Sequence, residues 1–333
     1  METIRDYLEL SKARLCAMVL VTTLVGYVLA VPQPDLGRRF LATLLGTYLS
    51  ALGANALNQV LERDADARMV RTQNRPLPAG RIGLRAALAW GVGAAAGGSG
   101  LLLVAAGPLP AVLAVATVLL YVGVYTPMKR VSSLNTLAGA VCGAIPPLIG
   151  WSAAAGGLSQ DAWLLFAVLF LWQMPHFLAL AWLYRDDYAR GGFVMLPVVD
   201  PGGRLTFQVT LLFALLLLPL GLTIVLAGIA GLWFALGATL LGLIWSGACL
   251  RLLRTGAHPD ARRVFLGSLA YLPLALGLMV ADRGPVTAPA GSPRSATVRL
   301  ARQLGAAEAV RSARPPVTDR ASGSEPKLQR AGR

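Results

Sequence analysis

Nine apolar stretches, each close to the length of a membrane-spanning helix, occupy most of this chain between residues 14 and 280. A helix needs roughly 17–25 apolar residues to cross the hydrocarbon core of a bilayer. Lipid offers no hydrogen bonds to an irregular backbone, so these stretches must be helical. The expected spans are residues 14–32, 40–60, 84–106, 109–125, 134–154, 162–184, 205–226, 228–250 and 264–280.

The composition agrees with a polytopic membrane protein. Hydrophobic residues make up 56% of the chain and charged residues only 14%, whereas soluble domains carry about 25% charged residues. We therefore predict an all-α membrane bundle of about nine transmembrane helices. The polar motifs of the loops and the proline breaks, and not the composition, lead us to expect a central cavity with the active site on the cytoplasmic side.

Basic residues gather in every second loop, and the opposite loops hold Arg38, Arg39 and few others. Because cytoplasmic loops are enriched in Lys and Arg, we expect the N-terminus and the acidic loops in the cytoplasm. An odd number of spans then places the C-terminus outside, in a multi-pass protein of the inner (plasma) membrane.

The composition changes after the last span. We predict a membrane domain over residues 1–282 and a disordered, basic tail over residues 283–333, rich in Pro, Ala, Ser and Gly. The net charge of +14 follows from the loop asymmetry and this tail, so we do not interpret it as nucleic-acid binding.

Asn58, Glu62 and Asp66 stand where the second span meets water. Their i, i+4, i+8 spacing places the three side chains near one face of a helix. Carboxylates at a membrane are costly and mark substrate or ion paths. Arg71 and Arg75 follow, and their guanidinium groups suit phosphate oxygens. The pattern predicts a metal-bridged anion, such as a diphosphate.

Further charged residues are expected on the same side of the membrane. Asp186 and Asp187 follow the sixth span, and Lys129 and Arg130 follow the fourth. Two carboxylate clusters each suit Mg²⁺, which prefers one or two carboxylates together with substrate phosphate oxygens. Solvated loop charges and the positive-inside bias are the alternative explanation, and the sequence leaves it open.

The sixth span contains Pro175 and His176 in the string Trp172-Gln-Met-Pro-His-Phe177. Proline disrupts the hydrogen bonds of a helix, and a membrane helix tolerates it where a cavity or a neighbouring helix compensates. An ionisable residue inside a span is a candidate functional residue, although a hydrogen-bonded structural His is the other interpretation. The pair Pro146-Pro147 predicts a second break in the fifth span. Together the two breaks favour a lined pocket.

Several blocks occur in an order that resembles the intramembrane aromatic prenyltransferase (UbiA-type) superfamily, over about residues 5–280, and most closely its haem-modifying branch. The blocks are Asn58-xxx-Glu62-xxx-Asp66 with Arg71-Thr-Gln-Asn-Arg75-Pro-Leu, Tyr125-Thr-Pro-Met-Lys129-Arg130, Gly143-Ala-Ile-Pro-Pro-Leu-Ile-Gly-Trp151, Trp172-Gln-Met-Pro-His176-Phe177, and Arg185-Asp-Asp-Tyr188 with Met195-Leu-Pro197. A single carboxylate motif is weak evidence, whereas five blocks in order are specific.

The resemblance implies transfer of a farnesyl group from farnesyl diphosphate to a vinyl group of haem B, giving haem O for terminal oxidase assembly. It implies Mg²⁺ as cofactor, the lipid bilayer as surroundings, and a haem A synthase or an oxidase assembly protein as partner. By position it implies catalytic roles for Asn58, Glu62, Asp66, Asp186 and Asp187, with Mg²⁺ on Asn58, Glu62, Asp66 and Asp187, diphosphate on Arg71, Arg75, Lys129 and Arg130, and haem on His176.

Two positions depart from the superfamily pattern. Glu62 stands where Asp is usual, and its longer carboxylate can still bind Mg²⁺. Asp186 and Asp187 are adjacent where a DxxxD motif is usual, so the sequence leaves open which of them binds metal. Two other functions also stay open: a sister prenyltransferase that acts on a quinone precursor, and a membrane transporter with a midplane site.

Overall fold

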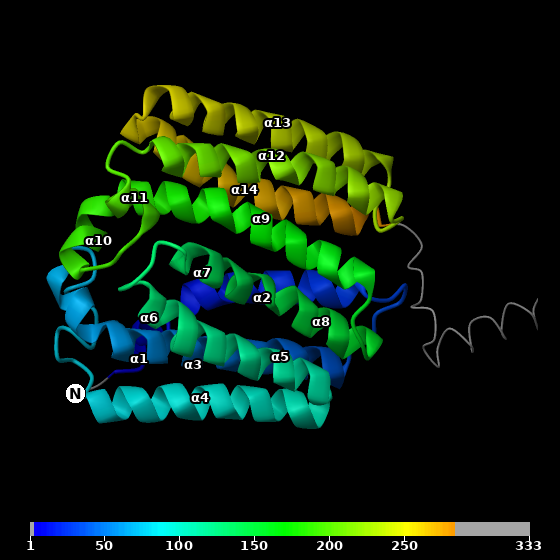
Figure 1. Ribbon diagram of the computed structural model, residues 1–333. Helices are drawn as coiled ribbons and strands as arrows, with labels where there is room; N and C mark the ends of the chain where they lie inside the picture. Colours follow the sequence, from blue (N-terminus) through cyan, green and yellow to red (C-terminus); the bar gives the residue numbers. More distant parts are fainter. Residues whose placement is uncertain (1–2, 284–333) are drawn as a thin grey trace, which may run out of the picture. The chain divides into compact units, whose positions relative to one another are not determined.

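The long helices of the chain lie side by side along one common direction (Figure 1). The computed structural model describes residues 3–283, and most of these are helical. In chain order the elements are α1 (Ile4–Leu10), α2 (Ala13–Leu29), α3 (Arg38–Arg68), α4 (Leu84–Ala105), α5 (Pro108–Leu119), the π-helical η1 (Leu120–Tyr125), α6 (Thr126–Met128), α7 (Asn135–Ala144), α8 (Pro146–Ala155), α9 (Gln160–Leu183), α10 (Arg185–Gly191), α11 (Leu196–Val199), α12 (Arg204–Leu226), α13 (Leu232–Thr255) and α14 (His258–Ala281).

The nine expected spans correspond to these helices. Within the described residues eight helical stretches are long and apolar enough to cross a membrane, and a ninth results if α1 and α2, which meet at 58°, count as one bent span. The largest difference is in α3, which continues past the expected end at Val60 to Arg68. The C-terminal end of α3 therefore lies beyond the apolar stretch and contains the polar residues.

The helices pack in two groups joined through α7 and α8. Helix α9 packs on α12 and α14, and α13 packs on both of these, whereas α2, α3, α4, α5 and α8 pack on one another. Small residues allow the closest approaches, as is usual between membrane helices. A Cβ at Gly150 of α8 would lie 1.9 Å from the carbonyl oxygen of Thr23 in α2.

The expected break at Pro146-Pro147 is confirmed, because α7 ends at Ala144 and α8 begins at Pro146. Pro175 lies inside α9 without ending it. The fourth span holds a feature that the sequence did not indicate, the π-helical η1. Such segments are rare and are often found at functional sites.

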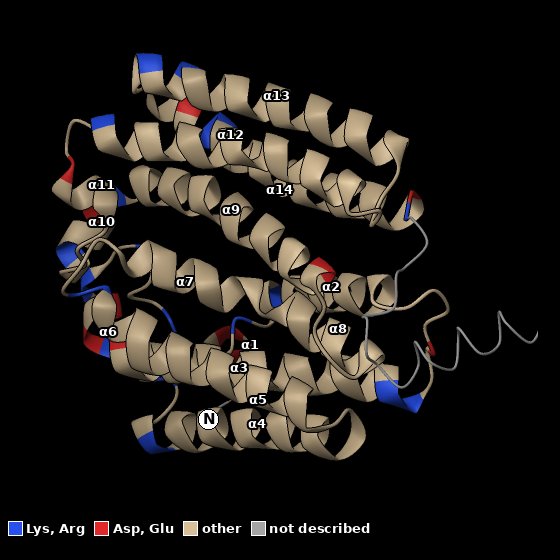
Figure 2. Cartoon of the chain, turned by 45° about the vertical axis from the view of Figure 1, so that its right-hand side comes forward, with Lys and Arg blue, Asp and Glu red and all other residues tan. Residues whose placement is uncertain are grey.

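Charged residues gather at the end of the bundle that carries α1, α6 and α10 (Figure 2). The alternation of charged and uncharged loops is thus a real asymmetry between the two ends of the helices. The predicted disordered tail lies, apart from Arg283, outside the described residues.

Candidate active site

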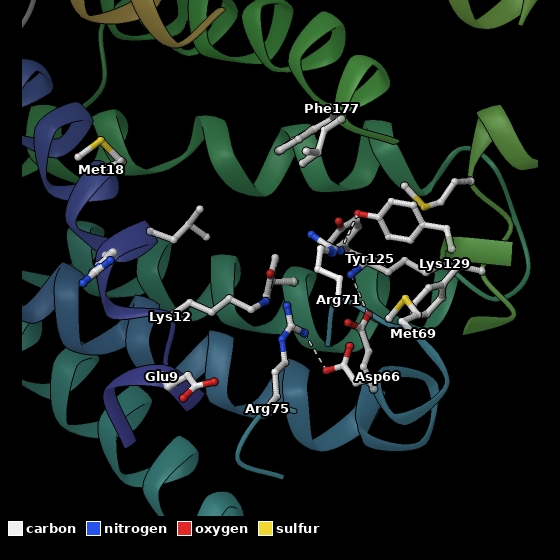
Figure 3. A pocket seen from close by; sticks show the side chains of 18 of the residues that line it. Glu9, Lys12, Met18, Asp66, Met69, Arg71, Arg75, Tyr125, Lys129 and Phe177 are labelled. Carbon is white, nitrogen blue, oxygen red and sulfur yellow. Dashed lines mark hydrogen bonds and ion pairs between the residues drawn. The ribbon is translucent and has the colours of Figure 1, made fainter. Parts of the chain in front are cut away.

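An open cavity of about 1010 Å³ lies among the charged side chains at this end (Figure 3). Its lining comes from α1, α2, α3, the loop after α3, η1, α9 and the segment around α10. One part of the lining is rich in acids and bases, and another carries His176 and Phe177. The cavity therefore offers a polar region for an anion beside an aromatic region.

Asn58, Glu62 and Asp66 follow one another along α3, as their spacing predicts. They are only 0%, 4% and 1% exposed. Glu62 and Asp66 line the cavity, whereas Asn58 lies behind its surface. Buried acids at a membrane boundary require compensating charge or hydrogen bonds.

Each member of this motif is paired with a base from a different element. Lys129 Nζ, just after α6, lies 2.7 Å from Glu62 Oε1. Arg75 Nη1, in the loop after α3, lies 2.8 Å from Asp66 Oδ2. Lys12 Nζ, between α1 and α2, donates to Asn58 Oδ1 at 3.1 Å. Three separate segments thus deliver basic side chains to one helix face.

Two aromatic rings lie next to the Lys129 ammonium. Its nitrogen is 4.5 Å from the centre of the Tyr125 ring and 5.6 Å from that of the Phe193 ring. Burial acts to lower the pKa of Lys129, but Tyr125 and the Glu62 carboxylate outweigh burial and raise this pKa above its ordinary value. The ion pair with Glu62 therefore favours the charged form of Lys129.

Arg71 also lines the cavity. Its guanidinium lies 4.7 Å from the centre of the Tyr184 ring and 5.6 Å from that of Tyr188, a cation–π geometry. In Figure 3 the side chains of Lys12, Arg71, Arg75 and Lys129 extend toward the same region of the cavity.

The Asp187 carboxylate accepts hydrogen bonds from the protein on both of its oxygens. Its Oδ1 accepts from the Val70 amide at 3.1 Å and from Arg190, and its Oδ2 accepts from the Arg71 amide at 3.3 Å. Burial acts to raise the pKa of Asp187, and these hydrogen bonds outweigh it and lower the pKa. The carboxylate fastens the loop that carries Arg71.

Besides Asn58, three predicted residues do not reach the cavity lining. These are Asp187, Asp186 and Arg130. The Asp186 side chain is 82% exposed and lies beside Arg185. Arg130 is exposed and donates to the carbonyl oxygen of Leu61 at 3.2 Å. Within residues 3–283, neither Asp186 nor Asp187 lines the cavity that Glu62 and Asp66 line.

The donor set of the first cluster fits Mg²⁺. Asp66 Oδ1 is buried and, among the described residues, has no hydrogen-bond partner. In the same part of the chain no three His, Cys, Asp or Glu side chains form a closed metal site. An open arrangement of one or two carboxylates is what Mg²⁺ uses when phosphate oxygens complete its coordination.

His176 lines the cavity from α9, close to Trp172 and Phe265, whose ring centres lie 5.1 and 5.0 Å from its own. Its Nδ1 lies 2.7 Å from Ser268 Oγ, and that hydroxyl donates to the carbonyl oxygen of Phe265. The one hydroxyl proton is thus committed, so Nδ1 must be the donor and Nε2 keeps its lone pair.

Sequence reasoning missed Lys12 and the two tyrosines of η1, Tyr121 and Tyr125, as cavity residues. In the sequence Lys12 is one of many loop cations, and the positive-inside bias explains such a residue equally well. The Tyr-Thr-Pro-Met-Lys block contained Tyr125, but no sequence signal indicated the π-helical turn.

Comparison with known proteins identifies close relatives. A protoheme IX farnesyltransferase of Solibacter usitatus (strain Ellin6076) is 45% identical over 291 residues, which cover 84% of this chain and 99% of that protein. A protoheme IX farnesyltransferase of Opitutus terrae is 43% identical over 279 residues, covering 84% of this chain and 94% of that protein.

Solved structures share the fold. Digeranylgeranylglyceryl phosphate synthase superposes with a TM-score of 0.72 at 18% identity, over 85% of this chain and 99% of that one. A UbiA homologue from Archaeoglobus fulgidus, bound to GPP and Mg²⁺, gives a TM-score of 0.63 at 13% identity, over 82% and 99%. The model of the UbiA prenyltransferase family matches residues 19–272, and this chain therefore belongs to that family.

Proposed function

We propose that this chain transfers the farnesyl group of farnesyl diphosphate to a vinyl group of haem B and so produces haem O. The observation that carries the proposal is the meeting of Glu62 and Asp66 with Arg71, Arg75 and Lys129 at one wall of a cavity that also contains His176. The named relatives, which align over 84% of the chain, support the choice of farnesyl diphosphate and haem B.

The bases of the cavity would bind the diphosphate and stabilise the negative charge that grows on it as the C1–O bond breaks. Arg71 and Arg75 present planar guanidinium groups suited to two phosphate oxygens, and Lys129 presents a compact charge. Arg130 lies outside the cavity lining, so we propose no direct substrate contact for it. No covalent nucleophile is needed, since the departing diphosphate leaves an allylic cation.

Asp66 and Glu62 would hold the Mg²⁺, and Asn58 Oδ1, on the same face of α3, would be a third ligand. When bound, the ion adds positive charge where the diphosphate becomes more negative. The UbiA homologue from Archaeoglobus fulgidus, which was solved with GPP and Mg²⁺, and the partnerless Asp66 Oδ1 support this assignment. For Asp187 we propose a positioning role, because its oxygens already hold the Val70 and Arg71 amides.

His176 would orient the haem. Its Nδ1–H is engaged by Ser268, so its Nε2 lone pair is available to a haem iron, and second-shell contacts of this kind fix the ring of a ligating His. The haem vinyl group then attacks the allylic cation to form a C–C bond. Water supplies hydroxide to the carbon next to the porphyrin, and its proton leaves with pyrophosphate, which gives the hydroxyethylfarnesyl group.

We also propose that the cavity faces the cytoplasm of a cell with an inner membrane. The charged end in Figure 2 supports this orientation, because loops rich in Lys and Arg stay on the cytoplasmic side.

The proposal is tested with labelled farnesyl diphosphate in membranes that contain the full chain. We expect label to enter haem in a reaction that a chelator of Mg²⁺ stops. Label in 4-hydroxybenzoate instead of haem would reassign the chain to quinone biosynthesis. Retention of all label in the diphosphate, whichever acceptor is supplied, would contradict prenyl transfer.

A further inference from the structure

Lys12 has an unusual backbone conformation. It is the only non-glycine residue between residues 3 and 283 with a positive φ, and its angles of φ 50° and ψ 47° are left-handed. Outside glycine this conformation is uncommon, with Asn and Asp its main exceptions. Lys12 lies at the 58° bend between α1 and α2, and its side chain lines the cavity.

The Lys12 ammonium is held by an amide whose orientation is itself fixed. Asn58 Nδ2 donates to Thr126 Oγ1 at 3.0 Å, and that hydroxyl donates to the carbonyl oxygen of Tyr121 at 2.8 Å. The amide nitrogen is therefore engaged on the η1 side, and Asn58 Oδ1 faces Lys12 Nζ at 3.1 Å. Among the described residues, Asn58 Oδ1 is the acceptor of the Lys12 Nζ group.

Asn58 Oδ1 is also a predicted Mg²⁺ ligand. Binding of both the Lys12 ammonium and Mg²⁺ to this one oxygen would be unfavourable. An ammonium and Mg²⁺ on one oxygen repel each other strongly in a buried site. Lysine has a flexible four-carbon stem with three donor hydrogens, so Nζ is able to change partner while the backbone bend stays in place. Figure 3 shows the Lys12 side chain reaching toward the region that Arg75 and Lys129 also face.

We propose that Lys12 is a partner-switching cation of the diphosphate site. Its ammonium donates to Asn58 Oδ1, and when the metal diphosphate binds, Nζ releases that oxygen and binds a diphosphate oxygen. The inference rests on the proposed function and adds to it a fourth base, supplied by the segment before α2.

The test measures binding to the purified full-length protein by calorimetry, with inorganic pyrophosphate plus Mg²⁺ as one probe and Mg²⁺ alone as the other. Lys12→Asn removes the charge, while Asn tolerates the left-handed backbone. Lys12→Gly is a second neutral variant that accepts this backbone, and Lys12→Arg keeps the charge. Arg85→Met is the matched control, because Arg85 is an exposed base at the start of α4, outside the cavity lining.

We expect Lys12→Asn and Lys12→Gly to weaken binding of magnesium pyrophosphate about 10- to 100-fold, the loss of one charge-assisted contact. They should bind Mg²⁺ alone as tightly as the parent chain or more tightly, since a competing cation is gone. Lys12→Arg should restore most of the pyrophosphate affinity, and Arg85→Met should match the parent chain.

Unchanged pyrophosphate affinity in both neutral variants would overturn the inference, and so would an equal weakening of both probes, which indicates a structural role. Failure of the parent chain itself to bind magnesium pyrophosphate would contradict the proposed function instead. The two failures are therefore distinguishable.

Discussion

Arg75 Nη1 lies 2.8 Å from Asp66 Oδ2, while Oδ1 of the same carboxylate is buried and has no hydrogen-bond partner among the described residues. One oxygen of Asp66 is thus committed to a base that can bind diphosphate, and the other has no partner within residues 3–283. Asp66 is therefore the side chain that links the metal and the diphosphate in the proposed mechanism.

Asp66→Asn should lower the rate of farnesyl transfer about 100- to 1000-fold, a typical cost of removing one electrostatic stabiliser of the transition state. The amide keeps the shape of the side chain and removes its charge. The measurement is kcat for pyrophosphate release at saturating substrate and Mg²⁺. Asp64→Asn is the matched control, because the Asp64 side chain is 83% exposed on the same helix. Equal rates for the two variants would remove the metal role of Asp66.

His176→Ala should weaken haem B binding about tenfold or more, since it removes the proposed iron ligand. Ser268→Ala should weaken binding less, because the imidazole remains and only the group that fixes its tautomer is lost. Optical titration with haem B measures both, and a change in the Soret band should accompany binding in the parent chain and in Ser268→Ala, but not in His176→Ala. An unchanged spectrum and affinity in His176→Ala would exclude His176 as a haem ligand.

Asp187→Asn should raise the KM for farnesyl diphosphate several-fold with a smaller effect on kcat. The substitution leaves the Val70 and Arg71 amides without a carboxylate, so the loop that presents Arg71 becomes less well fixed. Asp186→Asn is the control, because the side chain of Asp186 is exposed. A loss of kcat without a change in KM would instead support a metal ligand at position 187.

Gly150→Ala should destabilise the fold by about 1–3 kcal/mol, the usual cost of overpacking a tight contact. The added methyl group would meet the Thr23 carbonyl oxygen of α2. Gly93→Ala in α4 is the control, since a Cβ there meets nothing within 4 Å, and alanine has the higher helix propensity. Thermal melting in detergent should fall for the first variant and hold or rise for the second.

The helices were predictable because membrane length and apolarity leave the backbone few alternatives. Their ends were less predictable, since α3 continues to Arg68 through polar residues that no apolar window includes. The π-helical η1 depends on the local pairing of Thr126 with the Tyr121 carbonyl, and a hydropathy pattern contains no information on such a pairing.

The first half of the site was predictable for a similar reason: the i, i+4, i+8 spacing of Asn58, Glu62 and Asp66 fixes their common face. The second half was not, because it depends on how the loops fold back. The Asp187 carboxylate binds the loop after α3 and does not line the cavity. Lys12 reaches the cavity because the chain bends at this residue, between α1 and α2.

The most direct test is mass spectrometry of haem extracted after the purified chain has reacted with haem B, farnesyl diphosphate and Mg²⁺. We predict a haem heavier by one farnesyl group plus one hydroxyl group, with one pyrophosphate released for each such molecule. Unmodified haem B, in a preparation that binds both substrates and releases pyrophosphate, would contradict the proposed transfer to haem.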